Sequence, residues 1–144
     1  MKAARQSGFT LIELVVVITI LGILAAFAVP RFAALDQQAR IASRSALAGS
    51  VRSAAALSHA LWLAQGSTVA TVTVEGQSVT ITAGYPDRLT LGRTISDLNS
   101  SGFVYDTATG IFTRTGFAAC TITYTGPANA NTPPTIAVSA NNNC

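Results

Sequence analysis

The stretch from Phe9 to Val29, FTLIELVVVITILGILAAFAV, decides the fold, because it is long and apolar enough to cross a membrane as one helix. As an α-helix it would span about 31 Å at roughly 1.5 Å per residue, close to the hydrocarbon thickness of a bilayer. Its polar interruptions are Thr10, Glu13 and Thr19. The preceding residues, MKAARQSG, are few and positively charged, which predicts a cytoplasmic N-terminus.

An ordinary secretory signal is the alternative interpretation of this segment. The small residues Ala25, Ala26 and Ala28 resemble a signal-peptidase site. That interpretation leaves Glu13 unexplained, and the apolar run exceeds the usual length of about 7–15 residues. We therefore favour a spanning helix over a removable signal.

Glu13 is the residue of this helix that needs an explanation. A carboxylate inside a spanning helix is costly and normally has a partner or a task, yet no Lys, Arg or His lies between Phe9 and Val29. A cut just before Phe9 would expose an amine, with which the Glu13 carboxylate of a neighbouring copy could pair. The alternative is that Glu13 lies near the membrane edge and stays solvated.

Gly8 followed by FTLIEL, after a short basic leader and before a long apolar run, resembles the type IV prepilin signal. The resemblance implies that a membrane-embedded prepilin peptidase cuts between Gly8 and Phe9 and N-methylates Phe9, and that Glu13 acts in assembly. Gly22 and Pro30 lie where type IVa pilins commonly carry helix-loosening residues. Pro30 lacks an amide hydrogen, so we expect the helix to kink or locally unwind there.

A weaker resemblance extends further along the chain. PRFAAL after the apolar run, the Ala-rich segment that follows, Gly84-Tyr85-Pro86 and the late CTITY resemble the mannose-sensitive haemagglutinin branch of these pilins. The prepilin motif itself covers about Gly8 to Phe32, and the remainder is a likeness of pattern.

Residues 30–65 continue the helical pattern. An apolar stripe recurs at three- and four-residue steps through Leu47, Val51, Ala54, Leu57 or Ser58, and Leu61, and Gly66 is the natural C-cap. The resulting helix is too long for a small domain to cover, so its first half should protrude. We expect a leader at 1–8, a transmembrane or filament-core helix at 9–29, an amphipathic continuation at 30–65 and a globular head at 66–144.

After Gly66 the pattern changes to short strands. Runs of Thr and Val flank 75–77 as one hairpin, and two further runs flank 107–110 as another. We expect 84–87 to form a turn or loop, and TISDLNS (94–100) one short helical turn. The predicted class is α+β, with four to six antiparallel strands in a small sheet packed on the second half of the long helix.

The cysteines Cys120 and Cys144 lie late in the chain. Outside the cytoplasm we expect them to pair, whereas in a reducing cytosol they would stay free. A bridge would pin the polar tail ANNNC and stabilise the fold by roughly 3.5 kcal/mol in the chain-entropy model. Their spacing and distance from His59, the only histidine, predict no metal site.

Composition argues against catalysis and nucleic-acid binding. Charged residues make up 10% of the chain, and no nucleophile motif, phosphate-binding loop or adjacent carboxylate pair is present. We expect no enzyme, no cofactor and a structural role for His59. Two weaker patterns remain: Asn99-Ser100-Ser101 fits a glycosylation acceptor, and three loop carboxylates weakly suggest calcium binding. The head carries Arg88, Arg93 and Arg114 against Glu75, Asp87, Asp97 and Asp106.

The functional prediction is a structural subunit that polymerises into an extracellular type IV pilus-like filament for surface adhesion or motility. A type II secretion pseudopilin and a minor pilin for DNA uptake are the alternatives. The expected partners are further copies of this chain through their N-terminal helices, the prepilin peptidase and the inner-membrane assembly machinery. The precursor would cross the inner membrane once before the mature chain enters the filament.

Overall fold

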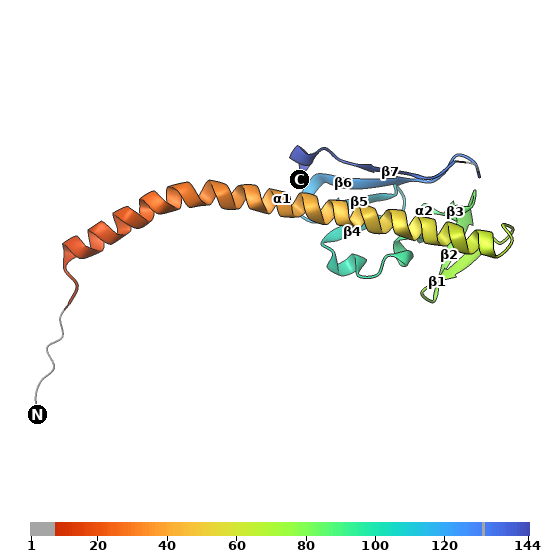
Figure 1. The fold of residues 1–144 in the computed structure, drawn as a ribbon, viewed down its shortest axis with the longest axis horizontal. Helices are drawn as coiled ribbons and strands as arrows, with labels where there is room; N and C mark the ends of the chain where they lie inside the picture. The colour runs from red at the N-terminus through yellow and green to blue at the C-terminus, as the bar shows by residue number, and fades with distance from the viewer. Residues whose placement is uncertain (1–7, 131) are drawn as a thin grey trace, which may run out of the picture. The chain divides into compact units, whose positions relative to one another are not determined.

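The computed structural model describes residues 8–130 and 132–144 (Figure 1). The chain divides into two compact units, one ending at Gln38 and the other running from Ala39 to Cys144, and the boundary falls within helix α1. The elements are, in chain order, α1 (Leu11–Ala64), β1 (Thr71–Val74), β2 (Gln77–Thr82), β3 (Tyr85–Pro86), α2 (Arg88–Leu91), η1 (Gly92–Thr94), η2 (Leu98–Ser100), β4 (Phe103–Asp106), β5 (Ile111–Arg114), β6 (Phe117–Thr125), β7 (Thr135–Val138) and η3 (Asn141–Asn143).

Helix α1 ends as the sequence predicts, with Gly66 outside its last turn. Gly66 adopts a φ of 83°, which is the left-handed region that glycine enters without steric cost. Its amide donates to the Leu63 carbonyl over 3.1 Å, and the Ser67 amide donates to the Trp62 carbonyl over 3.0 Å. This pair of bonds is a Schellman motif, and it satisfies two carbonyls that the helix end would leave open.

A three-stranded antiparallel sheet follows α1 in the order β1-β2-β3. Glu75 and Gly76 form the two-residue turn of the first hairpin with φ values of 49° and 79°, and Val74 pairs with Gln77. Positive φ at both turn positions matches the right-handed twist of the strands. Tyr85 and Pro86, which we expected to lie in a turn or loop, instead form the short strand β3, because Ala83 and Gly84 make the turn.

A connection of short helical turns joins the two sheets. The Asp87 carboxylate accepts from the Leu89 amide over 2.7 Å and caps the start of α2. Two 3-10 turns, η1 and η2, follow where the sequence predicts one helical turn. The connection then enters β4 at Phe103.

The second sheet is antiparallel with four strands in the order β4-β5-β6-β7. Asp106 pairs with Ile111 across the hairpin predicted at 107–110. The register of β5 against β6 shifts between Thr113 and Arg114, which places a bulge near the start of β6. The described strands thus number seven in two sheets, whereas we expected four to six strands in one small sheet.

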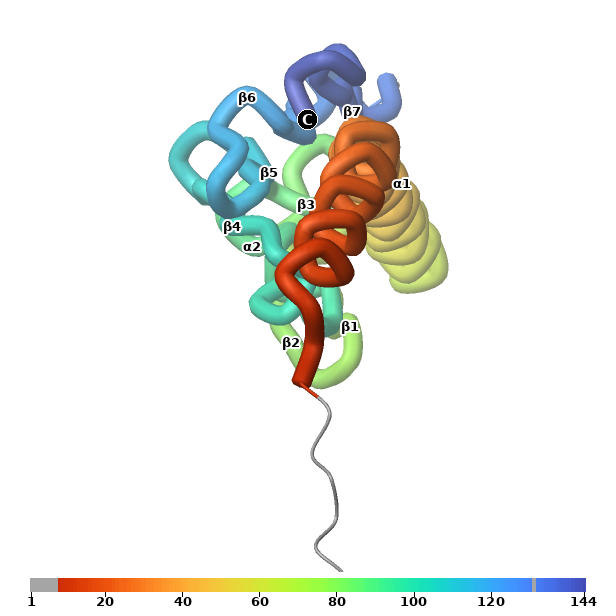
Figure 2. The backbone as a smooth tube through the Cα atoms, turned by 90° about the vertical axis from the view of Figure 1, so that its left-hand side faces the viewer, coloured from red at the N-terminus to blue at the C-terminus, as the bar shows by residue number. Residues whose placement is uncertain are grey.

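Two apolar clusters hold the second unit together, and both use α1. Figure 2 shows the strands gathered along one side of the C-terminal part of this helix. The α1 residues Leu47 and Val51 pack with the four-stranded sheet, and Trp62 packs with the three-stranded sheet. The fully apolar members of the larger cluster are Leu47, Ala48, Val51, Ala55, Leu91, Phe103, Phe112 and Ile122.

Candidate processing and assembly segment

Gly8 and Phe9 precede helix α1, which begins at Leu11. Phe9 is 91% exposed, and a Cβ added at Gly8 would meet no atom within 4 Å. The peptide bond between these residues therefore lies outside regular structure and open to an enzyme. The predicted leader comprises residues 1–8. Of these the structure describes Gly8, and residues 1–7 lie outside the described part of the chain.

Thr10 and Glu13 form a reciprocal hydrogen-bonded pair at the start of α1. The Thr10 amide donates to the Glu13 carboxylate over 2.9 Å, and the Thr10 hydroxyl donates to the same oxygen over 2.7 Å. The Glu13 amide in turn donates to the Thr10 hydroxyl over 3.3 Å. This is a capping box, in which a threonine and a glutamate three residues later satisfy the free amides of a helix start.

The capping box gives the Glu13 carboxylate a partner within its own chain. Thr10 is a third partner, besides the neighbouring amine and the solvent that the sequence suggests. The signal was present in the sequence, because Thr10 and Glu13 have the spacing of a capping box. The pattern is hidden because both residues lie inside an apolar run.

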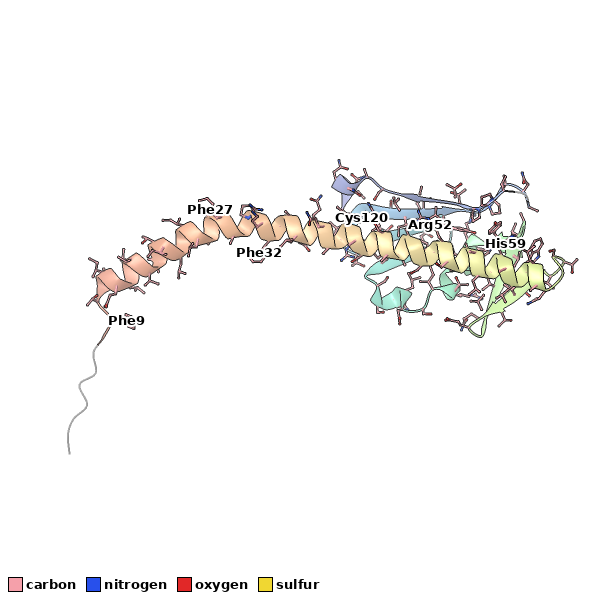
Figure 3. All side chains as sticks on the ribbon, viewed as in Figure 1. Phe9, Phe27, Phe32, Arg52, His59 and Cys120 are labelled. Atoms are coloured by element: carbon pink, nitrogen blue, oxygen red, sulfur yellow. A yellow bond between two sulfur atoms is a disulfide. The ribbon has the colours of Figure 1, made fainter. Side chains whose placement is uncertain are left out.

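The first part of α1 is apolar on all sides. An 18-residue window in this helix has a mean hydropathy of 2.8, and none of that window is buried. Figure 3 shows side chains projecting around this part of the helix, with Phe27 and Phe32 labelled. A helix that is apolar all round requires a bilayer or other apolar helices around it. Length and composition thus permit a single membrane span.

Gly22 and Pro30 both lie inside this helix. α1 runs from Leu11 to Ala64 without interruption, and Pro30 is a helical residue. A Cβ added at Gly22 would meet no atom within 4 Å, so no contact in the described chain requires glycine there. Loosening of the helix at Gly22 and Pro30 stays a prediction.

Cys120 and Cys144 are joined by a disulfide, and their Cα atoms lie 4.7 Å apart. Both residues are buried, and the bridge ties the tail after β7 to strand β6. The pairing that we expected for a chain outside the cytoplasm is thus present in the structure.

Arg44 holds the same tail from the helix side, and sequence reasoning missed it. Arg44 is 2% exposed, and its guanidinium donates to the Ser139 carbonyl over 2.8 Å and to the Asn141 side-chain oxygen over 2.7 Å. It also lies 3.3 Å from the Cys144 sulfur. One turn earlier, the Arg40 Nε donates to the Cys144 carbonyl over 2.5 Å. Two arginines of α1 therefore fix a tail that contributes little apolar surface.

His59 has a structural position. Its ring stacks on Tyr85 at a centroid distance of 4.2 Å, and its Nδ1 lies 2.7 Å from the Gly84 carbonyl oxygen. It thereby fastens α1 to the turn before β3. Within residues 8–130 and 132–144, no group of three His, Cys, Asp or Glu side chains could hold a metal ion.

Comparison with known proteins gives three relatives and one family motif. Residues 3–29 match the prokaryotic N-terminal methylation motif. The type IV narrow pilus major component PilA5 of Thermus thermophilus is 58% identical over 53 residues, which are 37% of this chain and 46% of the relative. The type II secretion system core protein G of Pseudomonas aeruginosa is 54% identical over 41 residues, 28% of this chain and 29% of the relative.

The type IV major pilin protein PilE of Neisseria gonorrhoeae is 43% identical over 60 residues, 40% of this chain and 36% of the relative. The chain thus spans less than half the length of these relatives. No solved structure matches the chain.

Proposed function

Because the chain carries the N-terminal methylation motif and is homologous over part of its length to type IV pilins, we propose that it is a structural subunit of a type IV pilus-like filament. The observation that carries the proposal is the position of the motif. It covers residues 3–29, so it includes Gly8, Phe9 and the first part of a helix that is apolar on all sides. Such a helix suits both a bilayer and the interior of a bundle of like helices.

Processing is the first step of the proposed function. A prepilin peptidase in the inner membrane cuts between Gly8 and Phe9 and methylates the new amine of Phe9. Support comes from the exposure of Phe9 and its place ahead of the first helical residue. The leader would then be residues 1–8, and the mature chain would begin with the spanning segment 9–29.

Assembly is the second step. The methylated amine of Phe9 carries a positive charge, and the Glu13 carboxylate of the adjacent subunit is its counter-ion. For this pairing Glu13 exchanges its bonds with Thr10 for the neighbour's amine. The exchange fixes the axial register of each new subunit, and the inner-membrane assembly machinery draws the helix out of the bilayer. The body of the helix, 30–65, then joins the filament core to the head, 66–144.

A secretion pseudopilin is the second candidate, because the type II secretion system core protein G is among the relatives. The two candidates share the processing step and differ in whether fibres accumulate at the cell surface. Assignment to the mannose-sensitive haemagglutinin branch stays a prediction, as do adhesion and motility. The head has three arginines and four acidic residues, so its charge does not favour the binding of DNA for uptake.

The N-terminal peptide of the mature protein tests the proposal. Mass spectrometry of membrane or sheared surface material should find a chain that begins at Phe9 with a methylated amine. A mature chain that begins at Met1, or after Ala28, would contradict the proposed function. Electron microscopy of the sheared material separates a surface fibre from a secretion pseudopilus.

A further inference from the structure

The turn η2 carries an acceptor sequence that filament assembly does not use. Asn99 is followed at the second position by Ser101, with Ser100 between them, and this is the Asn-x-Ser pattern of N-glycosylation. None of the other asparagines in the chain has Ser or Thr at the second following position.

The structure places the Asn99 side chain in the open. Asn99 and Ser100 are exposed on η2, which lies in the connection between the two sheets. Within residues 8–130 and 132–144, no hydrogen bond engages the Asn99 amide. Asn99 borders two surface hollows, one of about 460 Å³ beside Tyr105 and one of about 420 Å³ beside Gln77. A sugar attached there has room on both sides.

We propose that Asn99 is an acceptor site for an N-linked oligosaccharide. This rests on the proposed function, because the head must leave the cytoplasm to meet the donor. The donor class is a polyprenyl-diphosphate-linked oligosaccharide. A bond forms between the Asn99 Nδ2 and C1 of the first sugar, the C1–oxygen bond to the diphosphate breaks, and the amide nitrogen loses one proton. The polyprenyl diphosphate leaves with the bonding electrons and takes up that proton.

The hydrogen bonds of Ser101 determine whether glycan transfer comes before or after the turn closes. Its hydroxyl donates to the Leu98 carbonyl over 2.6 Å and accepts from the Phe103 amide over 3.2 Å. A transferase that recognises this hydroxyl needs it free, so transfer takes place before the turn closes. Opening of this turn costs little free energy, because η2 is three residues long and the side chain of its N-cap residue, Asp97, makes no capping hydrogen bond.

The experiment produces the full chain in a bacterial host with a prepilin peptidase, a bacterial oligosaccharyltransferase and its lipid-linked glycan. The tryptic peptide 94–114 contains Asn99 as its single asparagine. Its mass should rise by one glycan, and fragmentation should place that glycan on Asn99. The gain should disappear in Asn99→Gln, which keeps an amide at the position, and in Ser101→Ala. It should remain in Ser101→Thr and in Ser100→Ala.

Two results would overturn the site. One is an unmodified Asn99 in cells where a reference acceptor protein is fully modified, and the other is a glycan found on a serine or threonine of the peptide. The same digest reports the N-terminal peptide. A chain processed at Phe9 with Asn99 unmodified rejects the acceptor site alone, whereas an unprocessed chain rejects the proposed function.

Discussion

Replacing Arg44 with methionine should weaken the attachment of the C-terminal tail to helix α1. Methionine keeps the length and the apolar stem of the side chain but offers no hydrogen-bond donor. The Ser139 carbonyl and the Asn141 side-chain oxygen would lose donors at 2.8 Å and 2.7 Å. Because Arg44 is buried, its removal leaves these acceptors without a ready replacement by water.

The magnitude follows from the two shortest of these bonds. A hydrogen bond to a charged group contributes about 1.5–3 kcal/mol, so the two bonds together contribute about 3–6 kcal/mol. Part of this free energy is regained in the variant. The Arg44 Nε is buried without a hydrogen-bond partner among the described residues, and methionine has no such atom. We therefore expect the free energy of unfolding to fall by about 3 kcal/mol.

Urea unfolding of the full chain in detergent measures this loss. Trp62 is the single tryptophan, and it lies in the cluster under the three-stranded sheet, so its fluorescence reports the unfolding of the head. Arg52→Met is the matched control, because Arg52 is exposed on the same helix, and its effect should stay within about 0.5 kcal/mol. An Arg44→Met protein within about 1 kcal/mol of the wild type would refute the role assigned to Arg44.

Four further outcomes are expected. Gly8→Val should block cleavage before Phe9 while Gly8→Ala is processed, and immunoblots of precursor and mature chain distinguish the two. Glu13→Gln should be processed yet form no surface filaments, because glutamine retains the capping box but not the charge; normal filaments from it would contradict the pairing. Cys144→Ser should lower the free energy of unfolding by roughly 3.5 kcal/mol at most, and unchanged urea midpoints would contradict this. Hydrogen bonds from the Thr109 hydroxyl and the Ala108 amide hold the pKa of Asp106 below its usual range. The stability that Asp106 contributes is therefore present above the unfolded pKa of about 3.9 and is lost as pH falls through the folded value. Asp106→Asn should remove that acid-dependent part of the urea midpoint.

The long helix, its C-cap and the two hairpins were predicted from local chemistry alone. The end of α1 follows from Gly66, and the first hairpin from Gly76, because each glycine provides a positive φ that the turn requires. These features depend on residues within a few positions of each other. The antiparallel α+β class followed from them and is confirmed.

What the sequence could not provide are contacts between distant residues. Strand β3 has two residues and gives no periodic signal, and it exists because β2 offers a partner edge. Arg44 is one of four arginines in α1, and no local pattern distinguishes it, but the fold brings it to Ser139, which is 95 positions away. The division into two sheets arises in the same way, from pairing that no local pattern specifies.

For Glu13, the sequence identifies the residue as important but does not identify Thr10 as its hydrogen-bond partner within the chain. In the described chain the carboxylate is already bonded to the amide and the hydroxyl of Thr10. If it also pairs with the amine of a neighbour, assembly replaces two bonds within the subunit by one ion pair between subunits. The driving force of docking is then the difference between the two arrangements and not the full strength of the ion pair. If the proposed pairing holds, Thr10 contributes to assembly together with Glu13, because its two hydrogen bonds must be given up before the carboxylate binds the neighbour's amine.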